Sequence, residues 1–364
     1  MRVIAALWMF TAIFSLPLKA EFVLEKQPKI NGEMMLGLAE LCQVASHTKS
    51  YLENYPDDGF AVHAGNDIFP ELTLARVKRT LDFVCQMSKE QQEITSEQLL
   101  QYFDFYRWLP DKQQADKLAL QSDNGVKKRL LNQIPEDQIF LTKYYTKLLD
   151  ASEVQTEKYN QALYQIPEDE ISLSIDQAEK MKAQLTRYRF TRQEIIAGAL
   201  KGEGLAKPLI WLTEEALHDV LLQGTGVVKV NGKTRYFNVH RNNGIAYDYT
   251  KGKREQARYW YFAEVPSILG YGKTIESKIA ITPDVTFAGN VKQLGLGKLF
   301  LINFTTGEQR YNQIGVLADQ GGAFDNNLFQ LDFLKGSYYG WQDYYQANKH
   351  LPDYVNAWLM LIKE

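Results

Sequence analysis

The stretch LADQGGAFDNNLFQLDFLKGS, residues 317–337, sets two acids, Asp319 and Asp332, in apolar surroundings on either side of a glycine pair. Asp332 stands between Leu331 and Phe333. Because side chains alternate along a strand, its carboxyl group shares the face opposite to these two apolar neighbours. A lone acid on a strand usually faces solvent, so this placement raises the question of whether the two acids form one site.

The glycines supply a reason to expect that they do. Asp319 ends an apolar run and is followed, after one residue, by Gly321 and Gly322. Glycine allows a tight turn and a close approach of backbone to the acid. Two carboxyl groups brought together away from water raise each other's proton affinity, so one of them is protonated near neutral pH. The pattern therefore predicts a general acid built from Asp319 and Asp332.

The first twenty residues have the pattern of a secretory signal: Arg2, an apolar run over residues 3–18, and then Lys19-Ala20. The run is shorter than the about 20 apolar residues that span a membrane. No cysteine stands near it to accept a lipid. We therefore expect a periplasmic or secreted protein with a signal peptide at 1–20 and no lipid anchor.

The composition favours a globular protein with a mildly acidic surface. Hydrophobic residues make up 45% of the 364, which supports a proper core, and the length allows two domains. Loss of Arg2 and Lys19 takes the net charge from −3 to −5, and there is no basic block. These features argue against nucleic acid as a partner. The 21 tyrosines have rings with a polar tip, which suit the apolar faces of sugars.

The chain has two cysteines, Cys42 and Cys85, both in helix-like stretches. In an exported protein, two thiols most simply form one disulfide. Two buried free thiols are the alternative.

Residues 30–130 are predicted to be mainly helical. Apolar residues recur at three- and four-residue spacing in TLARVKRTLDFV (73–84), and TSEQLLQYFDFYRWL (95–109) opens with a capping pattern. From residue 139 the pattern changes to strands, beginning with IFLTKYYTKLL (139–149). From 217 onward we expect mostly short strands, among them a hairpin with an Asn-Gly turn (227–244) and KIAITPDV (278–285).

Several motifs, in order, resemble one known family. They are FLTKYYTKLLDAS (140–152), KYNQALYQIPED (158–169), RFTRQEIIAGALKGEGL (189–205), VLLQGTGVVKVNGKTRYFNV (220–239), ARYWYFAEV (257–265), LADQGGAF (317–324) and FQLDFLKGS (329–337). Over about residues 139–361 the chain resembles the MltA family of lytic transglycosylases, whose C-terminal part is the 3D domain, named for three aspartates.

The resemblance implies a fold that is mainly β with a helical N-terminal part: a double-psi β-barrel domain with an inserted second β-rich domain. The expected parts are a helical N-terminal part with the first barrel strands (21–165), the inserted MltA-type domain (166–264) and the double-psi barrel, or 3D, domain (265–364). A peptidoglycan strand would lie between the two domains. The family cleaves the β-1,4 bond between N-acetylmuramic acid and N-acetylglucosamine without water, leaving a 1,6-anhydro sugar, and no metal or cofactor is expected.

By position, the resemblance makes Asp332 the catalytic acid and base and Asp319 its supporting neighbour. Further residues are expected to line the glycan path: Tyr144, Tyr145, Gln223, Gly224, Gly321 and Gly322. Peptidoglycan glycan strands are the expected partner. Participation in a cell-wall enzyme complex stays open.

The sequence also departs from the family pattern. Thr282 stands at the position of the first aspartate, with Asp284 two residues on and on the same expected strand face. Ile245 replaces a histidine, and Lys143 replaces a glycine before the tyrosine pair. These changes leave a rival function open, a non-catalytic relative that binds peptidoglycan. A structural or protein-interaction module is a third class.

Overall fold

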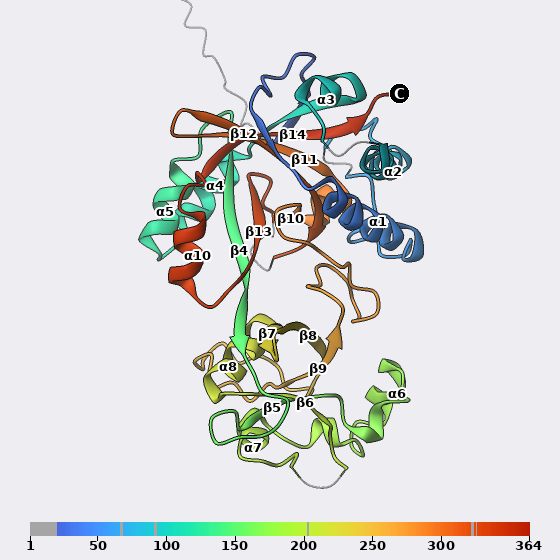
Figure 1. Ribbon diagram of the computed structural model, residues 1–364, viewed down its shortest axis with the longest axis vertical. Helices are drawn as coiled ribbons and strands as arrows, with labels where there is room; N and C mark the ends of the chain where they lie inside the picture. Colours follow the sequence, from blue (N-terminus) through green and yellow to red (C-terminus); the bar gives the residue numbers. More distant parts are fainter. Residues whose placement is uncertain (1–19, 66–67, 91–92, 202–203, 322–323, 325) are drawn as a thin grey trace, which may run out of the picture.

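The computed structural model describes residues 20–364 apart from 66–67, 91–92, 202–203, 322–323 and 325 (Figure 1). Residues 1–19 of the signal peptide predicted at 1–20, and Gly322, thus lie outside the described residues. In the part that is described, no helix is both long and apolar enough to cross a membrane.

The N-terminal part is helical, as the apolar spacing predicted. Two 17-residue helices, α1 (Leu38–Asn54) and α2 (Leu74–Glu90), pack together beside the sheet (Figure 1). Each buries one apolar stripe, which in α2 includes Val77, Leu81 and Val84. Three shorter helices follow: α3 (Ser96–Tyr102), α4 (Lys112–Leu120) and α5 (Gly125–Asn132).

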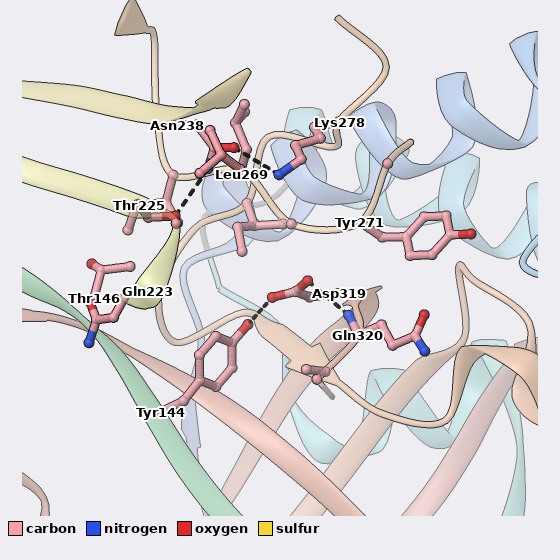
Figure 2. Close-up of a pocket in the computed structure, with 18 of the residues that line it drawn as sticks. Tyr144, Thr146, Gln223, Thr225, Asn238, Leu269, Tyr271, Lys278, Asp319 and Gln320 are labelled. Carbon is pink, nitrogen blue, oxygen red and sulfur yellow. Dashed lines mark hydrogen bonds between the residues drawn. The ribbon is translucent and has the colours of Figure 1, made fainter. Parts of the chain in front are cut away.

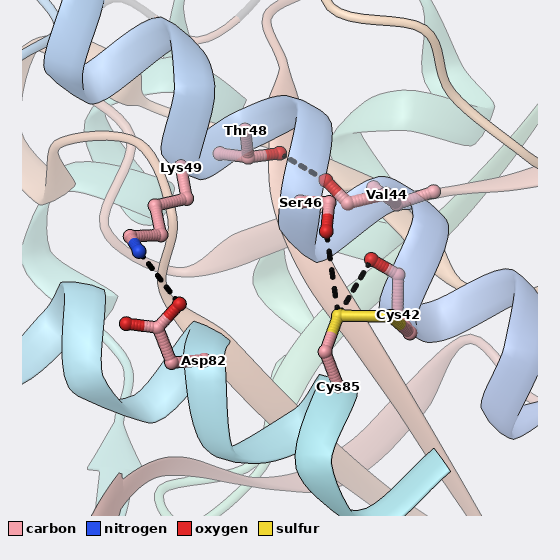
Figure 3. The surroundings of a disulfide bond; sticks show 7 residues. All are labelled: Cys42, Val44, Ser46, Thr48, Lys49, Asp82 and Cys85. Atoms are coloured by element: carbon pink, nitrogen blue, oxygen red, sulfur yellow. Dashed lines mark hydrogen bonds and ion pairs between the residues drawn. A yellow bond between two sulfur atoms is a disulfide. The ribbon is translucent and has the colours of Figure 1, made fainter. Parts of the chain in front are cut away.

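A disulfide between Cys42 and Cys85 joins α1 to α2 (Figure 3). The two Cα atoms lie 4.6 Å apart, across a sequence separation of 43 residues. Further along the same two helices, Lys49 Nζ donates to Asp82 Oδ1 at 2.7 Å. The covalent link and the ion pair both hold the two helices at the same crossing.

Two strands also occur within residues 30–130, which were expected to be mainly helical: β2 (Glu33–Met35) and β3 (Phe103–Leu109). A further strand, β1 (Glu21–Leu24), precedes this region. The capping box at Thr95 does start a helix, but α3 ends at Tyr102 and the chain continues directly as β3. The segment FDFYRWL is rich in aromatic residues, which favour strands. It pairs with β1 on one side and with the C-terminal strand on the other.

Six strands close into a barrel, which confirms the predicted fold class. In order round the ring they are β14 (Tyr354–Ile362), β11 (Leu299–Thr306), β12 (Gln309–Asp319), β10 (Thr286–Ala288), β13 (Gln330–Tyr338) and β4 (Ile139–Asp150), and pairing of β4 with β14 completes the circle. Two of the pairings, β10 with β12 and β13 with β4, are parallel. The barrel is thus assembled from one strand near residue 140 and five beyond residue 285.

The strand expected at 278–285 is wrong. These residues form one isolated bridge, between Leu269 and Ala280, followed by a turn, and β10 begins only at Thr286. Pro283 lacks a backbone donor, and Asp284 has a φ of +64°. Both features are incompatible with a continuous central strand.

The chain between the two parts of the barrel builds a second hydrophobic core, reached by the far end of β4 (Figure 1). Its strands are β5 (Gln161–Tyr164), β6 (Pro208–Leu212), β7 (Thr225–Val230), β8 (Lys233–Asn242) and β9 (Trp260–Val265). Its helical segments are η1 (Glu168–Glu170), α6 (Ile175–Lys180), η2 (Thr186–Tyr188), α7 (Arg192–Ile196) and α8 (Glu214–Gln223). The Asn-Gly turn joins β7 to β8 at the predicted place, with positive φ at Asn231 and Gly232.

Two short helices complete the barrel half: α9 (Val291–Leu294) after β10, and α10 (Trp341–Asn348) between β13 and β14. Figure 1 shows β4 running from the barrel to the second core, while the segment after β9 leads back. The two cores are therefore joined by two crossings of the chain.

Candidate functional site

The short strand β10 brings Asp319 and Asp332 together. It lies between β12 and β13, and its last residue, Ala288, is in register with Asp319 on one side and with Asp332 on the other. The two acids, 13 positions apart in the sequence, are thus placed one strand to either side of a single small residue. The side chain of Ala288 is a single methyl group, so the space over it, between the two acids, stays free.

A cavity of about 580 Å³ lies over this point, between the barrel and the second core (Figure 2). The barrel supplies both acids together with Tyr144, Tyr145 and Gly321. The second core supplies Gln223, Gly224, Thr225 and Asn238. The segment that returns from β9 to the barrel adds Leu269, Tyr271 and Lys278.

The carboxylate of Asp319 is well supplied with donors. The hydroxyl of Tyr144 donates to Oδ2 at 2.9 Å, and the backbone N–H of Gln320 donates to Oδ1 at 2.8 Å (Figure 2). Burial raises the pKa of Asp319 to about 6, while these two donors and the charge of Lys278 act in the opposite direction. Asp319 is therefore the acid of the pair that is better stabilised as an anion.

Asp332 has a different environment. Its Oδ1 is buried and has no hydrogen-bond partner among the described residues. Burial raises the pKa of Asp332 to about 7; Thr142 and Lys143 lower this value, and the nearby charge of Asp319 raises it. A carboxyl group with such a pKa is partly protonated at neutral pH, so it can give up a proton and take one back.

The two predicted tyrosines occupy neighbouring positions on β4 with different contacts. Tyr144 holds Asp319, and burial raises its own pKa well above the usual range. Tyr145 lines the cavity and stacks on Tyr344, with ring centroids 4.5 Å apart and an interplanar angle of 18°. Tyr144 therefore contacts the acid pair, whereas Tyr145 packs in an aromatic cluster.

Gln223 lines the cavity, but it does not belong to one of the strands expected from residue 217 onward. It is the last residue of α8, and Gly224 ends that helix with a φ of +76°. Only glycine adopts this conformation without strain, which explains its place here. The Oε1 of Gln223 accepts from the backbone N–H of Lys147 at 2.9 Å, so the side chain joins α8 to β4.

Of the predicted glycines, Gly321 lines the cavity and Gly322 lies outside the described residues. A side chain at Gly321 would not fit, since an added Cβ would lie 2.7 Å from the ring of Phe324.

The position of the family's first aspartate contributes nothing to this cavity. Thr282 and Asp284 lie in a turn, so the expectation that they share a strand face is wrong. The carbonyl of Thr282 accepts from the Thr286 hydroxyl at 2.7 Å, and the carboxylate of Asp284 pairs with Lys335. Neither residue lines the cavity.

Lys143 does not line the cavity, although its charge lowers the pKa of Asp332. Its ammonium donates to the carbonyl of Pro352 at 3.0 Å and to Asp353 Oδ1 at 3.3 Å. The family's glycine is thus replaced by a lysine that ties β4 to the segment before β14.

Sequence reasoning missed Lys278 and Asn238. Lys278 Nζ donates to Asn238 Oδ1 at 2.8 Å, and Asn238 Nδ2 donates to Thr225 Oγ1 at 3.0 Å (Figure 2). Lys278 begins the segment that was assigned to a strand, and a lysine at a strand end carries no signal of its own. Within the described chain, no group of three or more His, Cys, Asp or Glu side chains could hold a metal ion.

The comparisons with known proteins agree with this architecture. Residues 140–251 match the family model of the MltA specific insert domain. MltA of Escherichia coli, solved with bound chitohexaose, has a TM-score of 0.53 at 14% identity, with 96% of each chain covered. No curated protein sequence matches the chain.

Two further solved structures are similar. The membrane-bound lytic murein transglycosylase of Agrobacterium tumefaciens has a TM-score of 0.53 at 14% identity, covering 94% of this chain and 97% of that one. MltA of Neisseria gonorrhoeae has a TM-score of 0.53 at 13% identity, covering 90% and 87%. At this level of identity the similarity establishes the fold.

Proposed function

We propose that this protein, which carries the MltA specific insert domain within the MltA fold, is a lytic transglycosylase of peptidoglycan. It would cleave the β-1,4 bond between N-acetylmuramic acid and N-acetylglucosamine and leave a 1,6-anhydro end. The observation that carries the proposal is the acid pair on either side of Ala288. One member, Asp332, has its pKa raised to about 7 and a buried oxygen that finds no hydrogen-bond partner among the described residues.

In the proposed reaction Asp332 acts first as an acid. Protonated, it gives its proton to the glycosidic oxygen while that oxygen leaves the anomeric carbon of the muramic acid residue, which develops oxocarbenium character. The carboxylate then takes the proton of the same sugar's C6 hydroxyl, and the oxygen of this hydroxyl bonds to the anomeric carbon. The nucleophile belongs to the substrate, so no second catalytic carboxylate and no water are needed.

Asp319 supports this cycle without exchanging the proton. Tyr144 and Gln320 keep its carboxylate hydrogen-bonded, and its charge raises the pKa of Asp332. An ionised neighbour makes the acid form of Asp332 more abundant at neutral pH.

The glycan strand would lie between the barrel domain (265–364, with the first strands from 21–165) and the inserted domain (166–264). The relative from E. coli was solved with chitohexaose, a glycan, which supports this class of ligand. Tyr145 is proposed to stack on a sugar, and Gln223 to hydrogen-bond through the amide hydrogens that Lys147 leaves free. Such a substrate puts the protein outside the cytoplasm.

One observation favours a second function, that of a non-catalytic protein that binds peptidoglycan. Thr282 replaces the family's first aspartate, and the nearby Asp284 is paired with Lys335 instead of joining the acid pair. Such a replacement is expected in a relative that retained the glycan-binding groove but lost the ability to cleave the glycan.

Digestion of purified sacculi separates the functions. We expect the protein to release 1,6-anhydro-muropeptides, identified by mass spectrometry. Binding to insoluble sacculi without release would establish the second function, and failure to bind would leave a protein-interaction module.

The glycan path has its own test, Tyr145→Ala, with Tyr249→Ala as the matched control. Tyr249 is 92% exposed and does not line the cavity. Weaker sacculus binding in the first variant alone, at unchanged melting temperature, supports the path. Equal binding by both variants contradicts it.

A further inference from the structure

Lys278 is the one lysine or arginine among the described residues that line the cavity. It lies on the segment between β9 and β10, which Leu269 and Ala280 pin together by a bridge. Figure 2 shows its ammonium and the carboxylate of Asp319 on facing sides of the cavity. The charge of Lys278 acts on Asp319, whereas the cation that acts on Asp332, Lys143, does not line the cavity.

The structure holds this cation in a defined place. Lys278 Nζ donates to Asn238 Oδ1, and Asn238, only 1% exposed, is in turn held by donation to Thr225. The backbone around Lys278 is also closely packed, since a Cβ added to Gly272 would lie 2.5 Å from its Cα. Lysine side chains usually move freely in solvent, whereas Lys278 is fixed at its ammonium group by Asn238 and at its backbone by close packing.

The charged and titratable groups around the acid pair are few. Tyr144 of β4 and Lys278 face Asp319, and Asp332 of β13 is its acid neighbour. On the other side of the pair, the charge of Lys143 of β4 lowers the pKa of Asp332, and the charge of Asp332 raises the pKa of Tyr344 of α10. Burial lowers the pKa of Lys278, and the charge of Asp319 raises it, so the ammonium and the carboxylate stabilise each other.

The two acids are therefore unequal in their partners. Asp319 has two hydrogen-bond donors and a fixed cation, whereas Asp332 Oδ1 has no partner among the described residues. Opposite charge favours the ionised form of the acid that it faces.

We propose that Lys278 is a positioning residue of the acid pair: fixed by Asn238, its ammonium holds the negative charge on Asp319 and thereby leaves the proton on Asp332. The expected effect of Lys278 on turnover rests on the function proposed above. The charge distribution itself does not, because it is a property of the free protein.

The first test is a titration without substrate. The protein is labelled with ¹³C at the aspartate carboxyl carbons, Asp319 and Asp332 are assigned from their Asn variants, and their midpoints are measured by NMR. Lys278→Met should raise the midpoint of Asp319 by on the order of one pH unit, because a facing cation is lost. Lys278→Arg should restore it.

Lys292→Met is the matched control, since Lys292 is an exposed lysine of α9 that does not line the cavity. It should leave both midpoints unchanged. An unchanged midpoint of Asp319 in Lys278→Met overturns the proposal.

A reciprocal measurement needs no change at Lys278. In Asp319→Asn the lysine loses the carboxylate that raises its pKa, so its own midpoint should fall. A midpoint equal to that of the parent would overturn the proposal even if Lys278→Met does not fold.

The pH–rate profile on sacculi gives the functional readout. Its acidic limb reports ionisation of Asp319, so Lys278→Met should move that limb to higher pH, and Lys278→Arg should move it back. A loss of rate with an unmoved limb would mean that Lys278 is merely structural. If the parent releases no anhydro-muropeptides, the proposed function fails, whereas the titration still decides the role of Lys278.

Discussion

Glu170 in the second core and Asp332 in the cavity are both carboxyl groups removed from water, yet their surroundings are opposite. Glu170, at the end of η1, has no exposed surface. Arg187 Nε donates to its two oxygens at 2.9 and 2.7 Å, and Arg241 NH1 donates to Oε1 at 2.6 Å. Asp332 lies beside another acid, and one of its oxygens has no partner in the described chain.

The difference separates a carboxylate that is held as a structural anion from a carboxyl group that can exchange a proton. Taking a charge out of water costs several kcal/mol unless partners replace the lost hydration. The two arginines replace it for Glu170, which therefore serves as a fixed anion that joins η1, η2 and β8. For Asp332 the cost is relieved by binding a proton, and a bound proton is what an acid catalyst needs.

The largest expected effect is on turnover. Asp332→Asn is nearly isosteric but has no acidic proton, so it should lower the release of anhydro-muropeptides by about 10²–10⁴-fold or more, the usual contribution of acid–base catalysis. Release is measured by mass spectrometry on sacculi. Sacculus binding and the circular dichroism spectrum should stay those of the parent, and a variant with most of the parent's activity would refute the mechanism.

The second effect tests the structural carboxylate. Glu170→Gln removes the charge that compensates Arg187 and Arg241, so the free energy of unfolding should fall by about 3–5 kcal/mol, as for other broken buried pairs. Chemical denaturation measures it.

Glu179→Gln is the matched control, because Glu179 also pairs with Arg187 but its side chain is 53% exposed. Its loss should cost about 1 kcal/mol or less. Equal losses in both variants would contradict the distinction between the two regions.

The third effect is on stability at Asp332, where loss of the charge should stabilise the fold, in contrast to Glu170. The pKa of an unfolded aspartate is near 3.8, and burial raises the pKa of Asp332 to about 7 in the folded chain. Between these values the folded state binds the extra proton, so the contribution of Asp332 to stability is present at low pH and is lost as pH rises through about 7.

Asp332→Asn removes this loss. At pH 8 the variant should be more stable than the parent by on the order of 1–3 kcal/mol, and at pH 4 the two should be nearly equal. Denaturation at the two pH values measures the difference. A variant that is less stable than the parent at pH 8 would show that Asp332 has a stabilising partner.

The smallest effect concerns Asp319. Tyr144→Phe keeps the ring and removes the hydroxyl that donates to Oδ2. The pKa of Asp319 should rise by roughly one unit or less, moving the acidic limb of the pH–rate profile upward with little change in rate at the optimum. An unmoved limb would mean that Gln320 and Lys278 alone set the ionisation of Asp319.

Local pattern was sufficient for several parts of this molecule. Apolar spacing predicted α2, the capping residues at Thr95 predicted the start of α3, and Asn231-Gly232 predicted the turn between β7 and β8. Each of these predictions depends on residues within about one turn of helix or one hairpin. Such short-range interactions can be recognised from the sequence alone.

Local pattern was misleading where distant chain decides the outcome. FDFYRWL becomes β3 because the C-terminal strand pairs with it, more than 240 residues away. The helix that ends at Gln223 was missed for the same reason, since its apolar face packs on β5, β6 and β7. Tertiary pairing outweighs weak local preference. KIAITPDV is a different case, since Pro283, which is visible in the sequence, opposes a continuous strand.

By itself, the sequence determined that Asp319 and Asp332 are unusual: two acids in apolar strands around glycines, in motifs that resemble one family. Only the tertiary structure decided that β10 places them on either side of Ala288, that Tyr144 donates to Asp319 in a cavity that Lys278 also lines, and that Asp332 Oδ1 has no hydrogen-bond partner among the described residues. The physical reason is that a pKa depends on the dielectric and the charges around the group, which come from segments far apart in the chain. A residue's type is encoded locally, whereas its proton affinity is set by the groups that the fold brings to it.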